Sequence, residues 1–461
     1  MKIKFGTDGW RAIIAQEYTV DNVARVTVGA AQWLNYNFKN PSVVIGHDCR
    51  FAGSLFAETA AKVFNHFNIK VILADSFVTT PMLSLAVLEL KADLGVVITA
   101  SHNPPEYNGY KLKGNFGGPL LPDDIQAVED IIPDTHGLDL KSLTMIGVQT
   151  ADLVKIYVDK ARACFDIDTI NNSNFNWGYD AMYGAGREAV PALLPETTLL
   201  HCSDNPGFEG TAPEPIHRNL IEFSNIIRES GQIDCGLATD GDADRIGLYN
   251  AKGKFIDSHH IILLLIHYLV KYKRMSGKIV TAFSCSVKVA QMCAHYGLEH
   301  EIVKVGFKHI AGVMVKEDVL LGGEESGGVA IKGHIPERDG IWMGLVIWEY
   351  MAKTGKSLDD LIQEVYEITG EFAFERIDLK LEESKKLEIV ENCKKGVYTK
   401  FGDMPIVKTE RIDGFKFYFD EDSWIMIRPS GTEPVLRTYA EAKNQEKCFK
   451  ILKKVHQALL N

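Results

Sequence analysis

Apolar and polar positions repeat one arrangement three times along the chain. In each copy a short apolar run is followed by a turn of small or polar residues and then by a stretch with helical spacing. The apolar runs cover residues 42–48, 176–180 and 278–283. Strands that alternate with helices in this way predict layered α/β domains with largely parallel strands. Because the copies share a pattern rather than residues, we predict similar domains instead of a repeat array.

The last part of the chain has a different pattern. From residue 372 onward, short apolar runs alternate with charged helical stretches, which predicts a smaller α+β domain. A chain of 461 residues is also too long for one hydrophobic core. We therefore expect an α/β protein whose domains span residues 1–150, 151–255, 256–370 and 371–461.

Composition and charge narrow the classes of partner. The chain is 46% hydrophobic and 24% charged, as in ordinary globular proteins, and its net charge of −11 disfavours nucleic acid and anionic lipid. The longest apolar run, 260–270, is too short to span a bilayer and predicts a buried helix. The N-terminus has no signal-peptide pattern, and the eight cysteines form no C-x-x-C pair. We expect a cytoplasmic protein with no membrane or nucleic-acid partner.

A serine stands directly after a strand that the pattern predicts to be buried on both faces. Residues 94–99 form a continuous apolar, β-branched run, followed by Ala-Ser-His-Asn-Pro-Pro. The prolines delay any helix, so Ser101 is held at the carboxyl end of the strand, where open α/β sheets place ligands. A plain turn is the competing interpretation. A hydrolase pair of Ser101 and His102 is disfavoured, because loop neighbours rarely face each other and no G-x-S-x-G elbow is present.

Three aspartates follow another apolar run, at positions 240, 242 and 244. Alternate residues of a loop can turn to one side, and converging carboxylates repel unless a hard divalent cation offsets their charge. A calcium-binding EF-hand is excluded, because Arg245 replaces its glycine and Ala251 its glutamate. Ligation by oxygen alone favours Mg²⁺ or Mn²⁺ over zinc.

Two further loops carry groups suited to a sugar phosphate. The glycine-rich stretch 321–328 offers carboxylate acceptors for hydroxyl groups, although a simple surface turn explains it equally well. The stretch 427–434 combines small residues, hydroxyls and arginine, which together make a phosphate cradle. No Walker or G-x-G-x-x-G pattern indicates a nucleotide site.

Taken in order, these segments resemble the α-D-phosphohexomutase superfamily, the phosphoglucomutases and phosphomannomutases. Residues 5–11 (Phe-Gly-Thr-Asp-Gly-Trp-Arg) are similar to its N-terminal signature. The four other matching segments are 99–104 for the phosphoserine loop, 240–245 for the metal loop, 323–327 for the sugar loop and 428–434 for the phosphate loop.

The resemblance implies four domains around a central cleft, the first three of them alike. It implies that a phosphorylated Ser101 gives its phosphoryl group to a free hydroxyl of a hexose phosphate. A hexose 1,6-bisphosphate then forms, reorients and returns its original phosphate to the serine. The implied Mg²⁺ ligands are Ser101, Asp240, Asp242 and Asp244.

The resemblance also assigns the remaining site residues. Arg11 and Lys111 supply positive charge beside the transferring group. Either Lys111 or His102 handles the hydroxyl proton. The implied substrate-binding residues are Arg245, Lys308, Glu324, Ser326, Arg428, Ser430, Gly431, Thr432 and Arg437.

The sugar loop resembles that of glucose-type mutases. Glucosamine mutases usually carry glutamine where Glu325 stands, and dual-specificity enzymes often carry histidine where Gly328 stands. We expect a phosphoglucomutase with sugar phosphates as its partners, and mannose phosphate stays open as a second substrate because Gly328 departs from the dual-specificity pattern. A phosphoglucosamine mutase and, less favoured, a sugar-phosphate phosphatase are the alternatives. Whether the protein is a monomer or a homodimer stays open.

Overall fold

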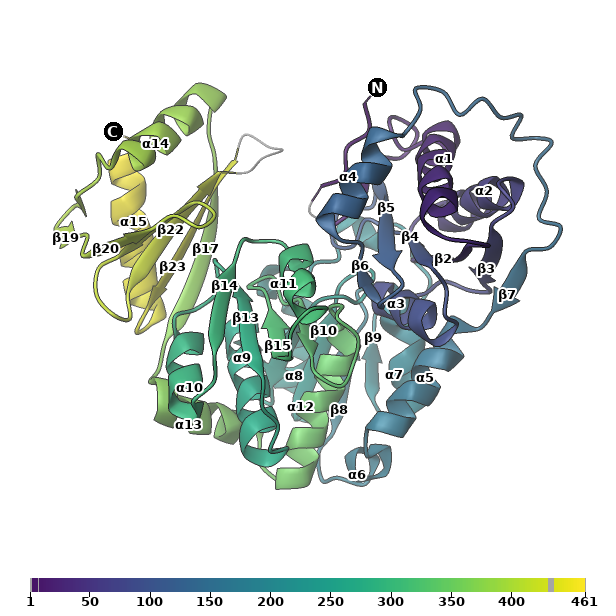
Figure 1. Ribbon diagram of the computed structural model, residues 1–461. Helices are drawn as coiled ribbons and strands as arrows, with labels where there is room; N and C mark the ends of the chain where they lie inside the picture. Colours follow the sequence, from purple (N-terminus) through teal and green to yellow (C-terminus); the bar gives the residue numbers. More distant parts are fainter. Residues whose placement is uncertain (1, 7, 430–434, 461) are drawn as a thin grey trace.

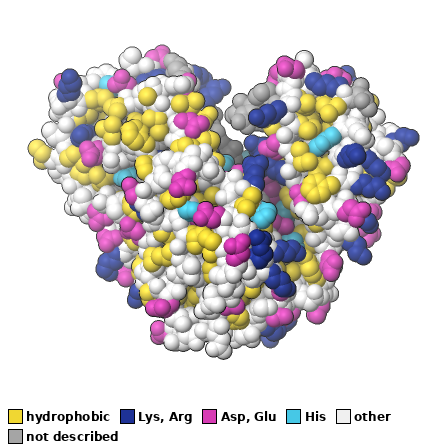
Figure 2. Space-filling model, turned by 180° about the vertical axis from the view of Figure 1, so that it is seen from behind, with side chains coloured by type: hydrophobic (Ala, Val, Ile, Leu, Met, Phe, Trp, Pro, Cys, Tyr) yellow, Lys and Arg dark blue, Asp and Glu magenta, His cyan; other side chains and the backbone are white. Residues whose placement is uncertain are grey.

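The computed structural model describes residues 2–6, 8–429 and 435–460. Its strands form four main sheets, which follow one another along the chain and define domains I to IV (Figure 1). The space-filling view shows a deep hollow between domain I and domain IV, with lysine and arginine side chains inside it (Figure 2). Three α/β domains and a final α+β domain around a central cleft confirm the predicted fold class.

Domain I contains a seven-stranded mixed sheet in the order β1-β5-β4-β2-β3-β7, with β6 paired to β5. Strand β4 runs parallel to β2 and antiparallel to β5, and it is buried along its whole length. The strands are β1 (Trp10–Ile13), β2 (Ser42–His47), β3 (Lys70–Ala74), β4 (Leu94–Ile98), β5 (Tyr107–Gly114), β6 (Gly118–Pro119) and β7 (Gln149–Ala151). The helices are α1 (Val20–Asn37), α2 (Gly53–His66), α3 (Thr80–Glu89) and α4 (Pro122–Asp130).

Domain II has a five-stranded sheet in the order β12-β11-β10-β8-β9. Strand β10 is parallel to β8 and antiparallel to β11, so the chain reverses between β10 and β11, at residues 240–245. The strands are β8 (Trp177–Asp180), β9 (Thr198–Leu200), β10 (Cys235–Thr239), β11 (Ile246–Asn250) and β12 (Phe255–Ile256). The helices are α5 (Leu153–Cys164), α6 (Ile167–Asn171), α7 (Ala189–Leu193), α8 (Ile221–Ser230) and the short η1 (Ala185–Glu188), η2 (Phe208–Gly210) and η3 (His217–Asn219).

Domain III has a four-stranded sheet in the order β14-β13-β15-β16, with β13 parallel to both neighbours. The strands are β13 (Lys278–Ala282), β14 (His300–Val303), β15 (Val319–Gly323) and β16 (Val329–Ile331). The helices are α9 (Ser258–His267), the π-helical turn η4 (Tyr268–Tyr272), α10 (Lys288–Tyr296), α11 (Phe307–Met314), α12 (Gly340–Thr354) and α13 (Leu358–Thr369). Every residue of α9 is buried, which confirms the predicted buried helix.

The largest hydrophobic core cluster joins the first three domains. It includes α3 residues of domain I, strand residues of domain II and most of α9 and α12 of domain III. Helix α12 is apolar on nearly all sides because the sheet of domain II and helix α9 both pack against it. Among the described residues, no helix has the length and apolarity needed to cross a membrane.

Domain IV has a core of its own. Its antiparallel sheet, in the order β17-β23-β22-β21-β20, contacts α15 on one face. The other face meets domain III, where the buried Lys416 ammonium lies 3.7 Å from the ring centroid of Trp424 and donates to the Cys285 carbonyl at 3.0 Å. The elements are β17 (Ala373–Lys380), α14 (Glu383–Lys395), β18 (Lys400–Phe401), β19 (Met404–Pro405), β20 (Lys408–Glu410), β21 (Phe415–Tyr418), β22 (Trp424–Pro429), β23 (Val435–Ala442) and α15 (Gln445–Leu460).

Candidate active site

The predicted serine and the predicted aspartates come from different domains and meet. Ser101 follows the buried strand β4, and its side chain is almost wholly inaccessible to solvent. Its Oγ donates a hydrogen bond to Asp240 Oδ2 at 2.7 Å, although 139 residues separate the two positions. The loop after β4 of domain I therefore faces the loop between β10 and β11 of domain II.

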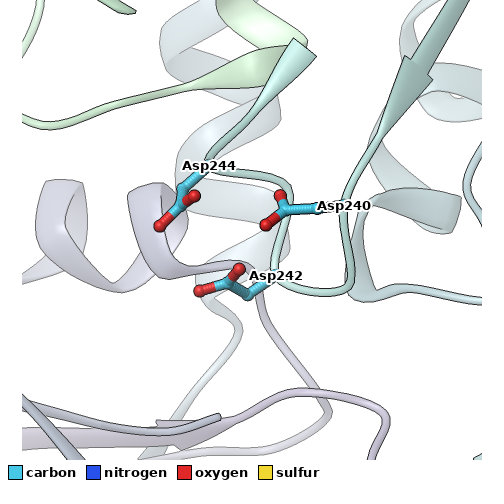
Figure 3. Close-up of side chains that lie close together, drawn as sticks. All are labelled: Asp240, Asp242 and Asp244. Carbon is cyan, nitrogen blue, oxygen red and sulfur yellow. The ribbon is translucent and has the colours of Figure 1, made fainter. Parts of the chain in front are cut away.

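The three aspartate side chains converge on one space (Figure 3). Asp240, Asp242 and Asp244 are fully buried, and each offers a carboxylate oxygen within 4.8 Å of the others. Oδ1 of Asp242 and Oδ1 of Asp244 have no hydrogen-bond partner in the described part of the chain. Buried carboxylate oxygens without a partner are costly, and a hard cation such as Mg²⁺ would satisfy them. The donor set therefore fits the predicted metal.

Burial and mutual repulsion also act on the ionisation of these carboxyl groups. Burial, together with the charges of Asp244 and Asp242, raises the pKa of Asp240 well above its ordinary value. Burial acts in the same direction on Asp242, but the Lys111 ammonium and the Thr80 hydroxyl together outweigh it and lower the pKa of that carboxyl. A bound divalent cation would favour the ionised form of all three groups.

Lys111 lies on β5 and its amino group is surrounded by acids. Nζ lies 2.8 Å from Asp8 Oδ2, 2.7 Å from Asp242 Oδ2 and 3.1 Å from Asp244 Oδ2. Burial lowers the pKa of this lysine, but the neighbouring carboxylates outweigh burial and raise the pKa above its ordinary value. Lys111 is therefore a permanent cation beside the serine loop.

The pKa of His102 is shifted in the direction that removes its charge, unlike that of Lys111. Burial and the nearby Arg245 and Arg11 guanidinium groups hold the pKa of its imidazole well below the ordinary value. The ring is therefore neutral at pH 7, and Nδ1 lies 3.4 Å from Ser101 Oγ. Of the two residues proposed for the hydroxyl proton, the neutral His102 has a ring nitrogen that can accept a proton, whereas the charged Lys111 has no acceptor.

The two predicted arginines of this region contact the same loops. Arg11, on β1, donates from Nη1 to the side-chain oxygen of Asn103 at 2.7 Å. The backbone N–H of Arg245 donates to Asp240 Oδ1 at 3.0 Å, and its Nη2 lies 3.5 Å from His102 Nε2. Both guanidinium groups thus stand beside the serine loop.

Sequence reasoning did not select two residues of this site, Arg338 and Asp8. Arg338, directly before α12, pairs with Asp8 and with Asp244, the latter at 2.7 Å, and its Nη1 lies 3.8 Å from Glu324 Oε2. It therefore links the metal loop to the sugar loop. Asp8 and Arg338 are separated by 330 residues. Asp8 stands inside the segment 5–11, which is similar to the N-terminal signature of the superfamily, but no pattern marks either residue individually.

The sugar loop between β15 and β16 presents two carboxylates. Glu324 accepts a hydrogen bond from the Gly306 N–H at 2.9 Å, and burial raises its pKa to about 7. Glu325 accepts from the Ser284 hydroxyl at 2.6 Å. Ser326, next in the same loop, and Lys308, in the first turn of α11, are both half-buried.

The predicted phosphate loop belongs to domain IV. Arg428 and Arg437 are cross-strand partners on β22 and β23, so their side chains share one face of the sheet. Nε of Arg428 lies 3.1 Å from Asp413 Oδ2, and Nε of Arg437 lies 3.9 Å from Asp378 Oδ2. The remaining predicted residues of this loop, Ser430, Gly431 and Thr432, lie outside the described residues.

Comparison with known proteins identifies the family to which this chain belongs. Family models named for phosphoglucomutase/phosphomannomutase match in four consecutive parts. They are the alpha/beta/alpha domains I, II and III and the C-terminal domain, over residues 2–137, 155–253, 257–368 and 377–457. A phosphoglucomutase/phosphomannomutase from Thermococcus kodakarensis is 30% identical over 456 residues, covering 97% of this chain and 96% of that protein. The chain belongs to the phosphoglucomutase/phosphomannomutase family.

Other members of the family differ in the sugar that they are named for. A phosphoglucosamine mutase from Methanococcus vannielii is 32% identical over 455 residues, which is 96% of this chain and 95% of that protein. The crystal structure of a putative phosphomannomutase from Thermus thermophilus superimposes with a TM-score of 0.89 at 30% identity, covering all of both chains.

Family membership confirms the predicted superfamily and the predicted class of enzyme. The chain is a phosphohexomutase, an isomerase that transfers phosphoryl groups within its substrate. Mg²⁺ dependence is a property of the family, and the aspartate triad is able to bind a metal. The roles of the individual site residues and the domain boundaries near 150, 255 and 370 stay predictions.

Proposed function

We propose that this phosphohexomutase interconverts the 1-phosphate and 6-phosphate of glucose through a phosphorylated Ser101. The observation that carries the proposal is the contact between Ser101 Oγ and the buried triad of aspartates at 2.7 Å. A nucleophilic hydroxyl beside a site for a divalent cation is suited to phosphoryl transfer and has no evident structural purpose.

In the first half of the proposed reaction the phosphoserine is the donor. A free hydroxyl oxygen of the hexose phosphate bonds to the phosphorus, the bond between phosphorus and Ser101 Oγ breaks, and His102 passes the hydroxyl proton to the Ser101 oxygen that leaves. The product is a hexose 1,6-bisphosphate. After this intermediate reorients, Ser101 Oγ bonds to the phosphorus of its other phosphate and the bond from that phosphorus to the sugar oxygen breaks. His102 passes the serine proton to the sugar oxygen, and the isomeric monophosphate remains.

Positive charge in the site suits the transferring group. Mg²⁺ held by the aspartates and the phosphoserine would offset the negative charge of that group. Lys111 and Arg11 add fixed cations from domain I. Across the hollow, Arg428 and Arg437 of domain IV hold the phosphate that does not react.

Sugar recognition is assigned to the two carboxylates of the loop after β15. Glu324 and Glu325 accept hydrogen bonds from sugar hydroxyls, and the loop resembles that of glucose-type mutases. An amino sugar is the second candidate substrate. Its ammonium group can pair with the same carboxylates, and relatives such as that of Methanococcus vannielii are named phosphoglucosamine mutases.

A panel of sugar phosphates tests the proposal. The 1-phosphates of glucose, mannose and glucosamine are assayed with Mg²⁺ and glucose 1,6-bisphosphate, and formation of the 6-phosphate is measured. We expect the highest kcat/KM for glucose. A higher value for glucosamine would replace glucose with the amino sugar, and release of inorganic phosphate equal to turnover would instead identify a phosphatase.

A further inference from the structure

Arg50 is a buried arginine behind the serine loop. It follows β2, and its side chain is completely inaccessible to solvent. The two terminal nitrogens of its guanidinium group donate to four backbone carbonyls of the loop. The acceptors are Ser101 at 2.7 Å and Asn103 at 2.5 Å from Nη2, and Pro104 at 2.8 Å and Tyr107 at 3.1 Å from Nη1.

This arrangement supplies donors to the carbonyls of the loop, one of which, that of Pro104, also accepts from the Tyr107 N–H at 3.1 Å. Between β4 and β5 the chain forms turns, and a buried carbonyl without a donor costs free energy comparable to a lost hydrogen bond. One planar guanidinium group supplies several donors in a fixed fork, whereas a lysine ammonium is a compact point with three. The four contacts therefore depend on arginine specifically.

The serine itself needs such support. Its φ angle is 54°, in the left-handed region that residues other than glycine rarely adopt. Its N–H donates to Thr99 Oγ1 at 2.9 Å, and Thr99 in turn donates to Asp48 Oδ2 at 2.5 Å. Nε of Arg50 lies 3.3 Å from the same Asp48 oxygen. Strained residues persist only where their surroundings over-determine them, and here both sides of the serine are held.

The same guanidinium group also contacts domain II. Its Cζ lies 4.9 Å from the ring centroid of Phe208, in the helix η2. Domain II also carries the aspartates that receive the Ser101 hydroxyl. Arg50 therefore lies between the loop that carries the nucleophile and the domain that carries the metal site.

We propose that Arg50 is a positioning residue for phosphoryl transfer, which acts through the carbonyls of the serine loop to aim Ser101 Oγ at the aspartate triad. The proposal rests on the proposed function. It assigns to Arg50 an effect on the rate of transfer, while the metal and the hexose phosphate are bound by other residues.

The test compares Arg50→Lys with Arg187→Lys. Arg187 is a matched control, because its side chain is also largely buried between domains I and II, stacks on Phe77 at 4.2 Å and donates to the Ser203 carbonyl at 2.9 Å. Each protein is phosphorylated with glucose 1,6-bisphosphate, and the excess bisphosphate is removed. Loss of phosphoserine is then followed by intact mass in a single turnover with glucose 1-phosphate. Steady-state kcat and KM, Mn²⁺ affinity and thermal unfolding are measured in parallel.

In Arg50→Lys we expect kcat and the single-turnover rate to fall about a hundredfold, the effect of misplacing a reacting group by about 1 Å. KM and Mn²⁺ affinity should stay close to the wild-type values, and Arg187→Lys should keep its kcat. Millimolar guanidinium should restore part of the rate of Arg50→Ala. If Arg50→Lys folds poorly, the double variant Asp48→Asn/Arg50→Gln, which buries no charge, replaces it.

Several results would overturn the inference. One is a wild-type rate in Arg50→Lys, and another is an equal loss in Arg187→Lys. A loss that appears in KM and Mn²⁺ affinity rather than in kcat would show a general disturbance of the fold. If the wild-type protein forms no phosphoserine and converts no hexose phosphate, the proposed function fails instead, and the two failures are thereby distinguished.

Discussion

The carboxyl group of Glu349, on α12, should make the stability of the protein depend on pH in a defined direction. Its oxygens accept from Lys273 at 2.8 Å, Lys353 at 2.9 Å and the Tyr268 hydroxyl at 2.8 Å. Burial raises the pKa of this group, but these donors outweigh burial and lower it to about 2.

The size of the effect follows from that pKa. Lowering it from 4.5 to about 2 corresponds to about 3.4 kcal/mol, at about 1.36 kcal/mol for each pH unit. Both lysine side chains are 37% exposed, so we reduce this figure to allow for screening by solvent and expect about 2 kcal/mol. In a cooperative unit of about 150–250 residues this corresponds to a decrease in Tm of about 4–8 °C for Glu349→Gln at pH 7.

The sign of the pH dependence is fixed by the lowered pKa. A carboxyl group whose folded pKa is depressed contributes stability above its unfolded pKa of 4.5 and loses it as pH falls toward 2. The difference in Tm between wild type and Glu349→Gln should therefore shrink between pH 5 and pH 3. The assay is thermal unfolding followed by circular dichroism at pH 7, 5, 4 and 3.

A surface pair provides the control. Glu391 pairs with Lys395 on α14 at 3.4 Å, and both side chains are more than half exposed. Glu391→Gln should therefore change Tm by less than about 2 °C, as expected for an exposed pair. The reasoning is refuted if the effect of Glu349→Gln stays constant down to pH 3, or if it is no larger than that of the control.

Three further predictions concern the site. Ser101→Ala should lower kcat by several orders of magnitude and abolish the phosphoryl adduct in intact mass spectra, and an adduct that persists would place the phosphate elsewhere. Asp244→Asn should weaken Mn²⁺ binding at least about tenfold in calorimetry, because one charged ligand is lost; equal affinity would remove this residue from the metal site. Since Glu324 ionises near pH 7, KM for glucose 1-phosphate should fall between pH 6 and pH 8 in wild type. Glu324→Gln should lack this fall, and identical profiles would contradict the assignment.

Local sequence patterns predicted the parts of the site that single segments create. The apolar run of β4 predicted the position of Ser101, and the alternation of three aspartates with Gly241 and Ala243 predicted that their carboxylates lie on one side of a loop. A buried strand with the residue after it, and a loop of alternating aspartates, depend only on residues close together in the sequence. The pattern of apolar and polar positions therefore predicts both.

Residues that act through distant partners were not predictable in the same way. Arg338 reaches Asp8 across 330 positions, and Arg50 reaches the serine loop across 51 or more. Neither arginine belongs to a periodic pattern, and only the packing of separate domains defines its partners. The register of the sheets and the burial of these guanidinium groups supply what the sequence alone does not contain.

The separate hydrophobic cores of domains I to III and of domain IV have a consequence for how the protein binds a sugar with two phosphates. One hydrophobic cluster joins parts of domains I, II and III, so the domains that carry the serine, the aspartates and the sugar loop are packed together. The phosphate loop stands on domain IV, which has its own core and meets domain III through a small aromatic cluster around Phe283. Under the proposed function, the reacting end of the substrate binds to the joined domains I to III and the other end binds to domain IV. If the bisphosphate reorients as proposed, a domain IV with its own core allows the second phosphate site to shift while the serine and the aspartates keep their positions.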